Sequence, residues 1–102
     1  MTYRVVLNRL VEDDVDHIAE WFLNHAGPEA ADRKVEELAA FLEMLAEMPH
    51  RGTVRSGYAE PVRAVPVDHK TTVVFSVDEG KREVHVHAIA YAGRNWMRRV
   101  TR

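Results

Sequence analysis

Residues 84–91 constrain the fold more than any other stretch, because two sets of side chains alternate along them. One set is small or aliphatic and the other includes two histidines: Val84, Val86, Ala88 and Ala90 against His85, His87, Ile89 and Tyr91. A period of two is typical of a β-strand, whose successive side chains point to opposite faces. A strand needs a partner, so this stretch predicts a sheet.

The segment just upstream, residues 71–77, alternates in the same way and supplies that partner. Asp78, Glu79 and Gly80 separate the two strands, and glycine tolerates the positive φ that a tight turn requires. We therefore predict an antiparallel hairpin over residues 70–92, with Gly80 in its turn.

Two further segments change to the three- and four-residue spacing of amphipathic helices. The first, residues 11–26, has an apolar stripe and an acidic start, where the helix dipole favours negative charge: Val11, Val15, Ile18 and Phe22, with Glu12, Asp13, Asp14 and Asp16. The second runs over residues 28–48, with Ala31, Val35, Leu38, Leu42 and Leu45. Gly27 and Pro28 leave so short a link that the helices must form an αα-hairpin.

The remaining elements complete an α+β fold in the order β-α-α-β-β-β. Residues 2–8 predict a strand at the edge of the hairpin, residues 50–61 a loop, and residues 62–67 another strand. The helical hairpin should pack on a small, mainly antiparallel sheet that ends in a short basic C-terminal tail. The 102 residues predict a single domain, 1–102.

Composition excludes several classes of protein. There is no cysteine, so disulfides and thiolate metal sites are excluded. No apolar run approaches the roughly 20 residues of a membrane span, and the N-terminus lacks the apolar segment of a secretory signal. We expect a soluble cytoplasmic protein with no cofactor and no membrane contact.

Charge divides the chain into two halves. Residues 1–51 hold 5 Lys/Arg and 11 Asp/Glu, whereas residues 52–102 hold 9 and 5, so one half is acidic and the other basic. Arg94, Arg98, Arg99 and Arg102 concentrate the positive charge at the end. This asymmetry suits contacts with two kinds of partner, or is ordinary surface charge.

Few residues predict chemistry. His85 and His87, with His69 as a third ligand, have a spacing that some metal sites use, but strand histidines on a sheet face explain them as well. Basic and aromatic side chains on the strands could hold a phosphodiester backbone or an acidic peptide, or be scattered surface charge: Arg63, Lys70, Arg82, Tyr91 and Arg94.

Several short motifs, in order, resemble one family. They are Tyr3-Arg4-Val5, Asp14-Val15-x-x-Ile18, Trp21-Phe22, Pro28-x-x-Ala31, Leu45-x-x-x-Pro49-x-x-Gly52, Val62-Arg63-x-x-Pro66-Val67, Val74-Phe75-x-Val77-Asp78 and Ile89-x-Tyr91-x-Gly93-Arg94-x-Trp96. Over nearly its full length the chain resembles the ParE/RelE superfamily of type II toxin–antitoxin toxins. The long helical hairpin is similar to the ParE branch.

This resemblance implies a toxin that a ParD-like antitoxin neutralises in a hetero-oligomer. It implies that the antitoxin contacts the apolar stripes of the helices, at Val15, Ile18, Phe22, Leu38, Phe41 and Leu42. A ParE-like toxin would inhibit DNA gyrase, with Arg94, Trp96, Arg98 and Arg99 at the contact. A RelE-like toxin would instead cut mRNA on the ribosome, with Arg63, Lys70, Tyr91 and Arg94.

The sequence departs from the RelE-like pattern at two places. No tyrosine or histidine follows Arg94, and no pair of lysines precedes Arg63. We therefore favour the gyrase-directed activity, with mRNA cleavage as the alternative and an inactive, binding-only protein as a third possibility.

Overall fold

A five-stranded sheet forms the centre of the computed structural model, which describes residues 2–55, 61–92, 96 and 99. The chain order is β1 (Arg4–Leu7), α1 (Val11–Ala26), α2 (Pro28–Glu47), β2 (Thr53–Arg55), β3 (Val62–Pro66), β4 (Thr71–Asp78) and β5 (Glu83–Tyr91). The strands lie in the order β1-β5-β4-β3-β2, and only β1 and β5 pair in parallel. The α+β fold and the hairpin of β4 and β5 are confirmed.

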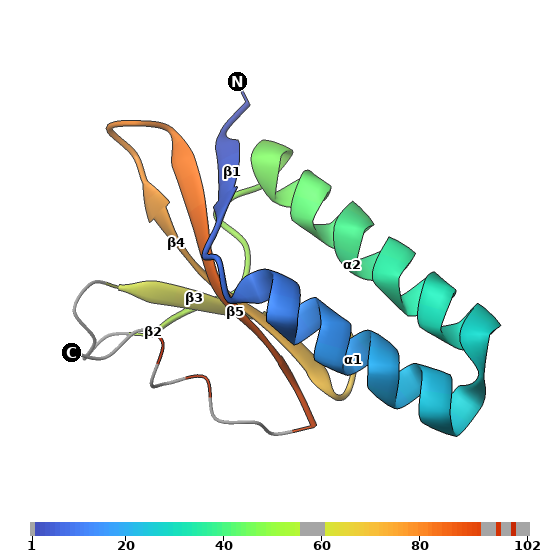
Figure 1. The fold of residues 1–102 in the computed structure, drawn as a ribbon. Coiled ribbons are helices and arrows are strands. Elements are labelled where there is room, and N and C mark those ends of the chain that lie inside the picture. Colours follow the sequence, from blue (N-terminus) through green and yellow to red (C-terminus); the bar gives the residue numbers. More distant parts are fainter. Residues whose placement is uncertain (1, 56–60, 93–95, 97–98, 100–102) are drawn as a thin grey trace.

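The helices lie side by side as an antiparallel pair on one face of the sheet, which we call the helix face (Figure 1). Gly27, at φ 93°, joins them directly, and Pro28 is the first residue of α2. The centres of their apolar stripes are buried: Val11, Ile18, Leu38 and Leu45 pack with Val73, Phe75, Val84 and Val86 of the sheet, whereas Val35 is exposed. The predicted helical hairpin is therefore confirmed, with α2 ending one residue early.

The alternation predicted for residues 84–91 is wrong in its second half, because β5 contains a β-bulge. Val74 pairs with Ala88 but Phe75 pairs with Val86, so His87 has no opposite residue on β4. The extra residue shifts the pattern by one. Ile89 and Tyr91 therefore join Val84 and Val86 in the core on the helix face, while Ala88 packs on the outer face.

Two local predictions also need correction. The loop predicted over residues 50–61 contains strand β2, whose three residues pair with β3. It begins after Gly52, where a Cβ atom would lie 2.2 Å from the Val65 side chain, so only glycine fits this close approach. In the β4–β5 turn it is Arg82, at φ 53°, and not Gly80 that takes the left-handed conformation.

One ion pair joins the start of α2 to the turn between β3 and β4. The Lys34 ammonium contacts Asp68, whose other oxygen accepts hydrogen bonds from the amides of Lys70 and Thr71 at 2.8 and 2.9 Å. Partial burial alone would raise the pKa of Asp68, but these donors outweigh it and lower the pKa to about 2.

Among the described helices, none is long and apolar enough to cross a membrane.

Replacing a buried leucine should destabilise the fold far more than replacing an exposed one. Leu45 is fully buried and Leu23 is 50% exposed, and both lie in helices. Leu45→Ala should lower the free energy of unfolding by about 2–5 kcal/mol. Leu23→Ala should change it by less than about 0.5 kcal/mol. Urea denaturation followed by circular dichroism measures both, and equal losses would contradict the core assignment.

Acid should weaken the Lys34–Asp68 contact. Because the folded-state pKa of Asp68 lies below its usual 3.8, its contribution is present above that pH and is lost as the pH falls toward about 2. The difference in unfolding free energy between wild type and Asp68→Asn should therefore shrink over this interval. Urea denaturation at a series of pH values measures it, and a constant difference would refute the assignment.

Candidate functional site

Asp14, in the first turns of α1, is buried against β5 and occupies the place where β1 ends. The last backbone bond at this edge of β5 runs from the Asn8 amide to the Val86 carbonyl, at 2.9 Å. Past the bulge, the amide of Ile89 donates to Asp14 Oδ2 at 3.0 Å instead. A carboxylate thus takes over from the strand, because a buried amide needs an acceptor.

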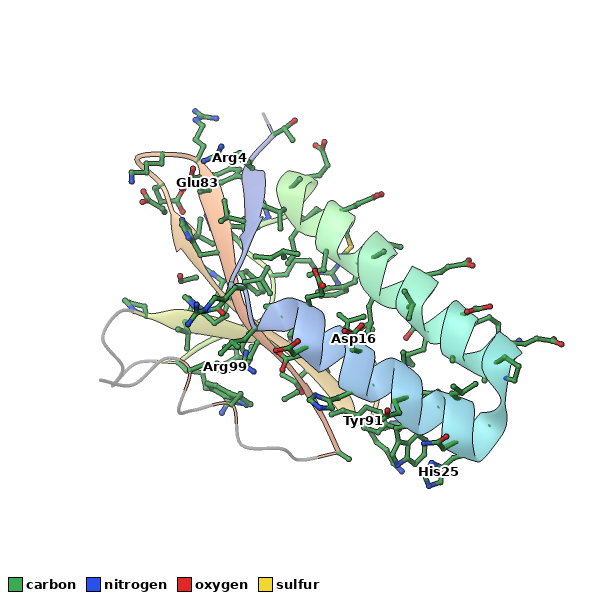
Figure 2. The ribbon with its side chains drawn as sticks, in the orientation of Figure 1. Arg4, Asp16, His25, Glu83, Tyr91 and Arg99 are labelled. Atoms are coloured by element: carbon green, nitrogen blue, oxygen red, sulfur yellow. The ribbon has the colours of Figure 1, made fainter. Side chains whose placement is uncertain are left out.

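Arg99 binds the same carboxylate. Its Nη2 donates to Asp14 Oδ1 at 2.7 Å, and its Nη1 to Asp14 Oδ2 at 3.0 Å. Nη1 also donates to the carbonyl of His87, the bulge residue, at 2.9 Å. Figure 2 shows Arg99 beside the start of α1, far from Tyr91 and His25 at its other end. Bidentate arginine–carboxylate ion pairs of this kind have short, charge-assisted hydrogen bonds and a specific geometry.

Trp96 lies on the outer face of the sheet. Its ring packs against Val62, Val74 and Ala88, and the Arg55 guanidinium lies 5.9 Å from the ring centroid. The Arg99 amide donates to the Trp96 carbonyl at 3.0 Å, which ties the two residues together.

These positions bear on the residues predicted to contact a target. Trp96 and Arg99 are described, whereas Arg94 and Arg98 lie outside the described residues. The Arg99 guanidinium is occupied by Asp14 and the His87 carbonyl, so it acts here as an internal anchor. Residue pattern could not predict this contact, because Asp14 is one of several acidic residues at the start of the helix.

Of the residues predicted for RNA cleavage, Lys70 and Tyr91 lie in one region and Arg63 lies apart from them. Tyr91 is 8% exposed, and its ring packs on Trp21 and Phe22 at centroid distances of 5.4 and 5.7 Å. The Lys70 ammonium lies 5.9 Å from the Trp21 ring centroid, in the same region.

Arg63 lies in a different part of the sheet. In the strand register Arg63 lies opposite Phe75 and Tyr91 lies opposite Thr71. Phe75 and Thr71 are four positions apart along β4, a distance of roughly 13 Å. Arg94 lies outside the described residues.

Arg63 instead lies near a polar cluster that sequence reasoning missed. Tyr3 donates to Glu79 Oε1 at 2.6 Å, and His50 Nε2 lies 2.5 Å from Glu79 Oε2. The hydrogen bond from Tyr3, then that from His50, lowers the pKa of Glu79, and the positive charge of Arg63 lowers it further. The same hydrogen bond raises the pKa of Tyr3. These residues come from four separate segments, so spacing could not reveal them.

The histidines on β5 have partners within the sheet. His87 Nε2 lies 2.8 Å from Ser76 Oγ, and His85 Nε2 lies 3.0 Å from Glu83 Oε1. In the part of the chain that the structure describes, no three histidine, aspartate or glutamate side chains gather as metal ligands would.

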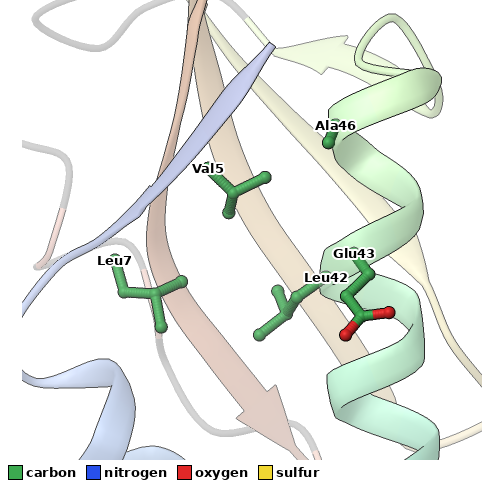
Figure 3. A pocket seen from close by; sticks show the side chains of 5 residues that line it. All are labelled: Val5, Leu7, Leu42, Glu43 and Ala46. Atoms are coloured by element: carbon green, nitrogen blue, oxygen red, sulfur yellow. The ribbon is translucent and has the colours of Figure 1, made fainter. Parts of the chain in front are cut away.

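An apolar groove runs between β1 and α2 (Figure 3). It has a volume of about 330 Å³ and is lined by Val5, Leu7, Leu42, Glu43 and Ala46. Leu7 is 48% exposed although it is aliphatic. β1 is the edge strand of the sheet, so the groove lies beside a strand edge that can accept a further strand.

The residues predicted to bind an antitoxin divide into two groups. Ile18 and Leu38 are 3% and 1% exposed, so they are core side chains in the folded chain. The others are only partly buried, packed against that core: Val15, Phe22, Phe41 and Leu42. Of the six, Leu42 lines the groove.

Comparison with known proteins gives one family and a consistent fold. The family model described as "ParE toxin of type II toxin-antitoxin system, parDE" matches residues 5–96. A chain of the chromosomal ParDE toxin–antitoxin system from P. aeruginosa matches with a TM-score of 0.73 at 20% identity, over 89% of this chain and 97% of that one. A chain of the toxin–antitoxin complex RelBE2 from Mycobacterium tuberculosis matches at 0.60 and 10%, over 89% and 99%. At these identities the structural likeness concerns the fold alone. A comparison with curated proteins found no match.

Proposed function

This chain belongs to the ParE toxin family of type II toxin–antitoxin systems, and we propose that it inhibits DNA gyrase in the cytoplasm and is neutralised by a ParD-like antitoxin. We favour gyrase inhibition over mRNA cleavage because Arg63 lies apart from Lys70 and Tyr91. An RNA-cutting site needs its charged and proton-transferring groups around one phosphate, and Arg63 lies too far along β4 to join Lys70 and Tyr91 there.

The anchored C-terminal residues support action by protein contact. Trp96 is held by packing on the outer face and Arg99 by a two-pronged ion pair. Side chains fixed before binding lose little conformational freedom on binding, which favours a protein interface. A partly exposed tryptophan with an arginine above its ring is also a common composition for an interface hot spot.

A second candidate, ribosome-dependent mRNA cleavage, is favoured by one specific observation. His50 and Glu79 lie in contact near Arg63, which places two groups that can transfer protons beside a cation that could hold a phosphate. All of these groups are on the surface, however, without the enclosed site in which such chemistry is most effective.

The groove between β1 and α2 is our proposed antitoxin site. An extended antitoxin segment would pair with the free edge of β1 and place apolar side chains against Val5, Leu7 and Leu42. Strand addition provides affinity through backbone bonds and specificity through the groove, and it would form the toxin–antitoxin hetero-oligomer.

Purified protein should inhibit gyrase and leave translated mRNA intact. Supercoiling and DNA-cleavage assays with gyrase measure the first effect, and primer extension on an mRNA under translation measures the second. New 5′ ends that disappear in Arg63→Gln and His50→Gln would establish the nuclease instead. A protein inactive in both assays that still binds its antitoxin would support the binding-only alternative.

A charge placed in the groove should weaken antitoxin binding selectively. Leu7→Glu would put an unpaired carboxylate against apolar side chains and the backbone edge, so we expect affinity to fall by at least about tenfold. Leu23→Glu is the matched control, because Leu23 is similarly exposed but does not line the groove. Calorimetry with the product of the adjacent reading frame measures both affinities. Equal losses, or none, would place the antitoxin elsewhere.

A further inference from the structure

The Asp14 carboxylate performs two tasks with two oxygens. Among the described residues, Oδ2 accepts from the Ile89 amide and from Arg99, and Oδ1 accepts from Arg99. The first contact completes the edge of β5, and the others hold a residue ten positions further along the chain. The fold and the C-terminal residues therefore depend on the same side chain.

This ion pair differs from the surface pairs of the molecule in its burial. The side chain of Asp14 is 11% exposed and that of Arg99 is 24% exposed. Partly buried charges interact more strongly than exposed ones, and removing one partner leaves the other without compensation. The His87 carbonyl, which the bulge turns toward this edge, adds a third acceptor for Arg99.

The anchor extends to Trp96. Because the Arg99 amide binds the Trp96 carbonyl, fixing the guanidinium also limits where the Trp96 ring can lie. The ring meets Val62, Val74 and Ala88 on the outer face, while the guanidinium reaches the start of α1. Trp96 and Arg99 are thus each held against the fold, and the hold on Arg99 depends on Asp14.

We propose that Asp14 is a positioning residue for toxicity: through Arg99 it holds Trp96 on the outer face in the arrangement that contacts the target. This rests on the proposed function in assuming that the C-terminal residues contact the target. Asp14 itself touches no target, and its effect passes through Arg99. Removal of the carboxylate's charge should release Trp96 and reduce toxicity, while the antitoxin groove on the far side of β1 keeps its shape.

Three variants separate positioning from folding. Asp14→Asn keeps an oxygen that can accept from the Ile89 amide but loses the charge that binds Arg99. Arg99→Gln removes the guanidinium, and Arg99→Lys restores the charge without the two-pronged geometry. Asp13→Asn is the matched control, because Asp13 is exposed and also lies in the acidic first turn of α1.

Trp96 can report on its own position. The chain has two tryptophans, so Trp21→Phe leaves Trp96 as the only one. In this background, Asp14→Asn and Arg99→Gln should shift the emission to longer wavelength and increase acrylamide quenching about twofold, since Trp96 gains water contact. Arg99→Lys should fall between these variants and the parent, and Asp13→Asn should match the parent. An unchanged Trp96 signal in Asp14→Asn would overturn the proposal.

Growth arrest after induced expression measures toxicity. Antitoxin affinity reports whether the rest of the fold is intact. Asp14→Asn should require about tenfold more protein for arrest, with antitoxin affinity unchanged and the protein folded at the assay temperature. Equal losses of toxicity and antitoxin affinity would indicate a structural role alone and overturn the proposal, as would full toxicity with Trp96 released. A wild-type chain that arrests growth without inhibiting gyrase would refute the proposed target, while the Asp14 comparison would still decide the positioning role.

Discussion

Strand β5 is paired on both edges for only half of its length, and much of the molecule is arranged around that constraint. β4 runs along one edge throughout, but β1 covers the other only from Glu83 to Val86. At the bulge the pairing changes from backbone to side chain, with Asp14 accepting from Ile89 and Arg99 donating to His87. Because β1 is short, an acidic side chain at the start of α1 completes the edge of β5, and the same side chain binds Arg99.

The two surfaces proposed to bind partners lie on different parts of the fold. The apolar groove is formed by β1 and α2 on the helix face, whereas Trp96 lies on the outer face. An antitoxin in the groove would not need to cover Trp96 directly. Both surfaces nevertheless border β5, since β1 pairs with its first half and the Asp14–Arg99 anchor closes its second half.

Sequence reasoning recovered the parts of the fold that depend on regular periodicity. The helical stripes and the β4–β5 hairpin were predicted because burial repeats at 3.6 or 2 residues in them. The bulge was missed because Ala88 and Ala90 fit either face of a strand by size. β2 was missed because its three residues are all exposed and carry no alternation. Both features depend on how the strands pair in the folded protein, which local residue patterns do not determine.

The contacts within the candidate site were not predicted, because they join residues far apart in sequence. Arg99, which was predicted to contact a target, binds Asp14, 85 positions away, and residue spacing gave no indication of that ion pair. Tyr91 was named for the alternative of RNA cleavage. The bulge directs its side chain to the helix face, where the ring packs against Trp21 and Phe22. Residue type and spacing indicated the family, whereas the environment of each side chain needed coordinates.

The pairing of β1 with β5 also has a consequence for the order of assembly. Arg4 lies opposite Glu83, so the first strand cannot take its place until most of the chain has been synthesised. Closing so long a loop costs chain entropy before any contact compensates for it. Until then the helical hairpin has no complete sheet to cover, and Arg99 is made later still. The surface proposed to carry toxicity is therefore among the last to form, which leaves an interval in which a nascent chain cannot yet present it.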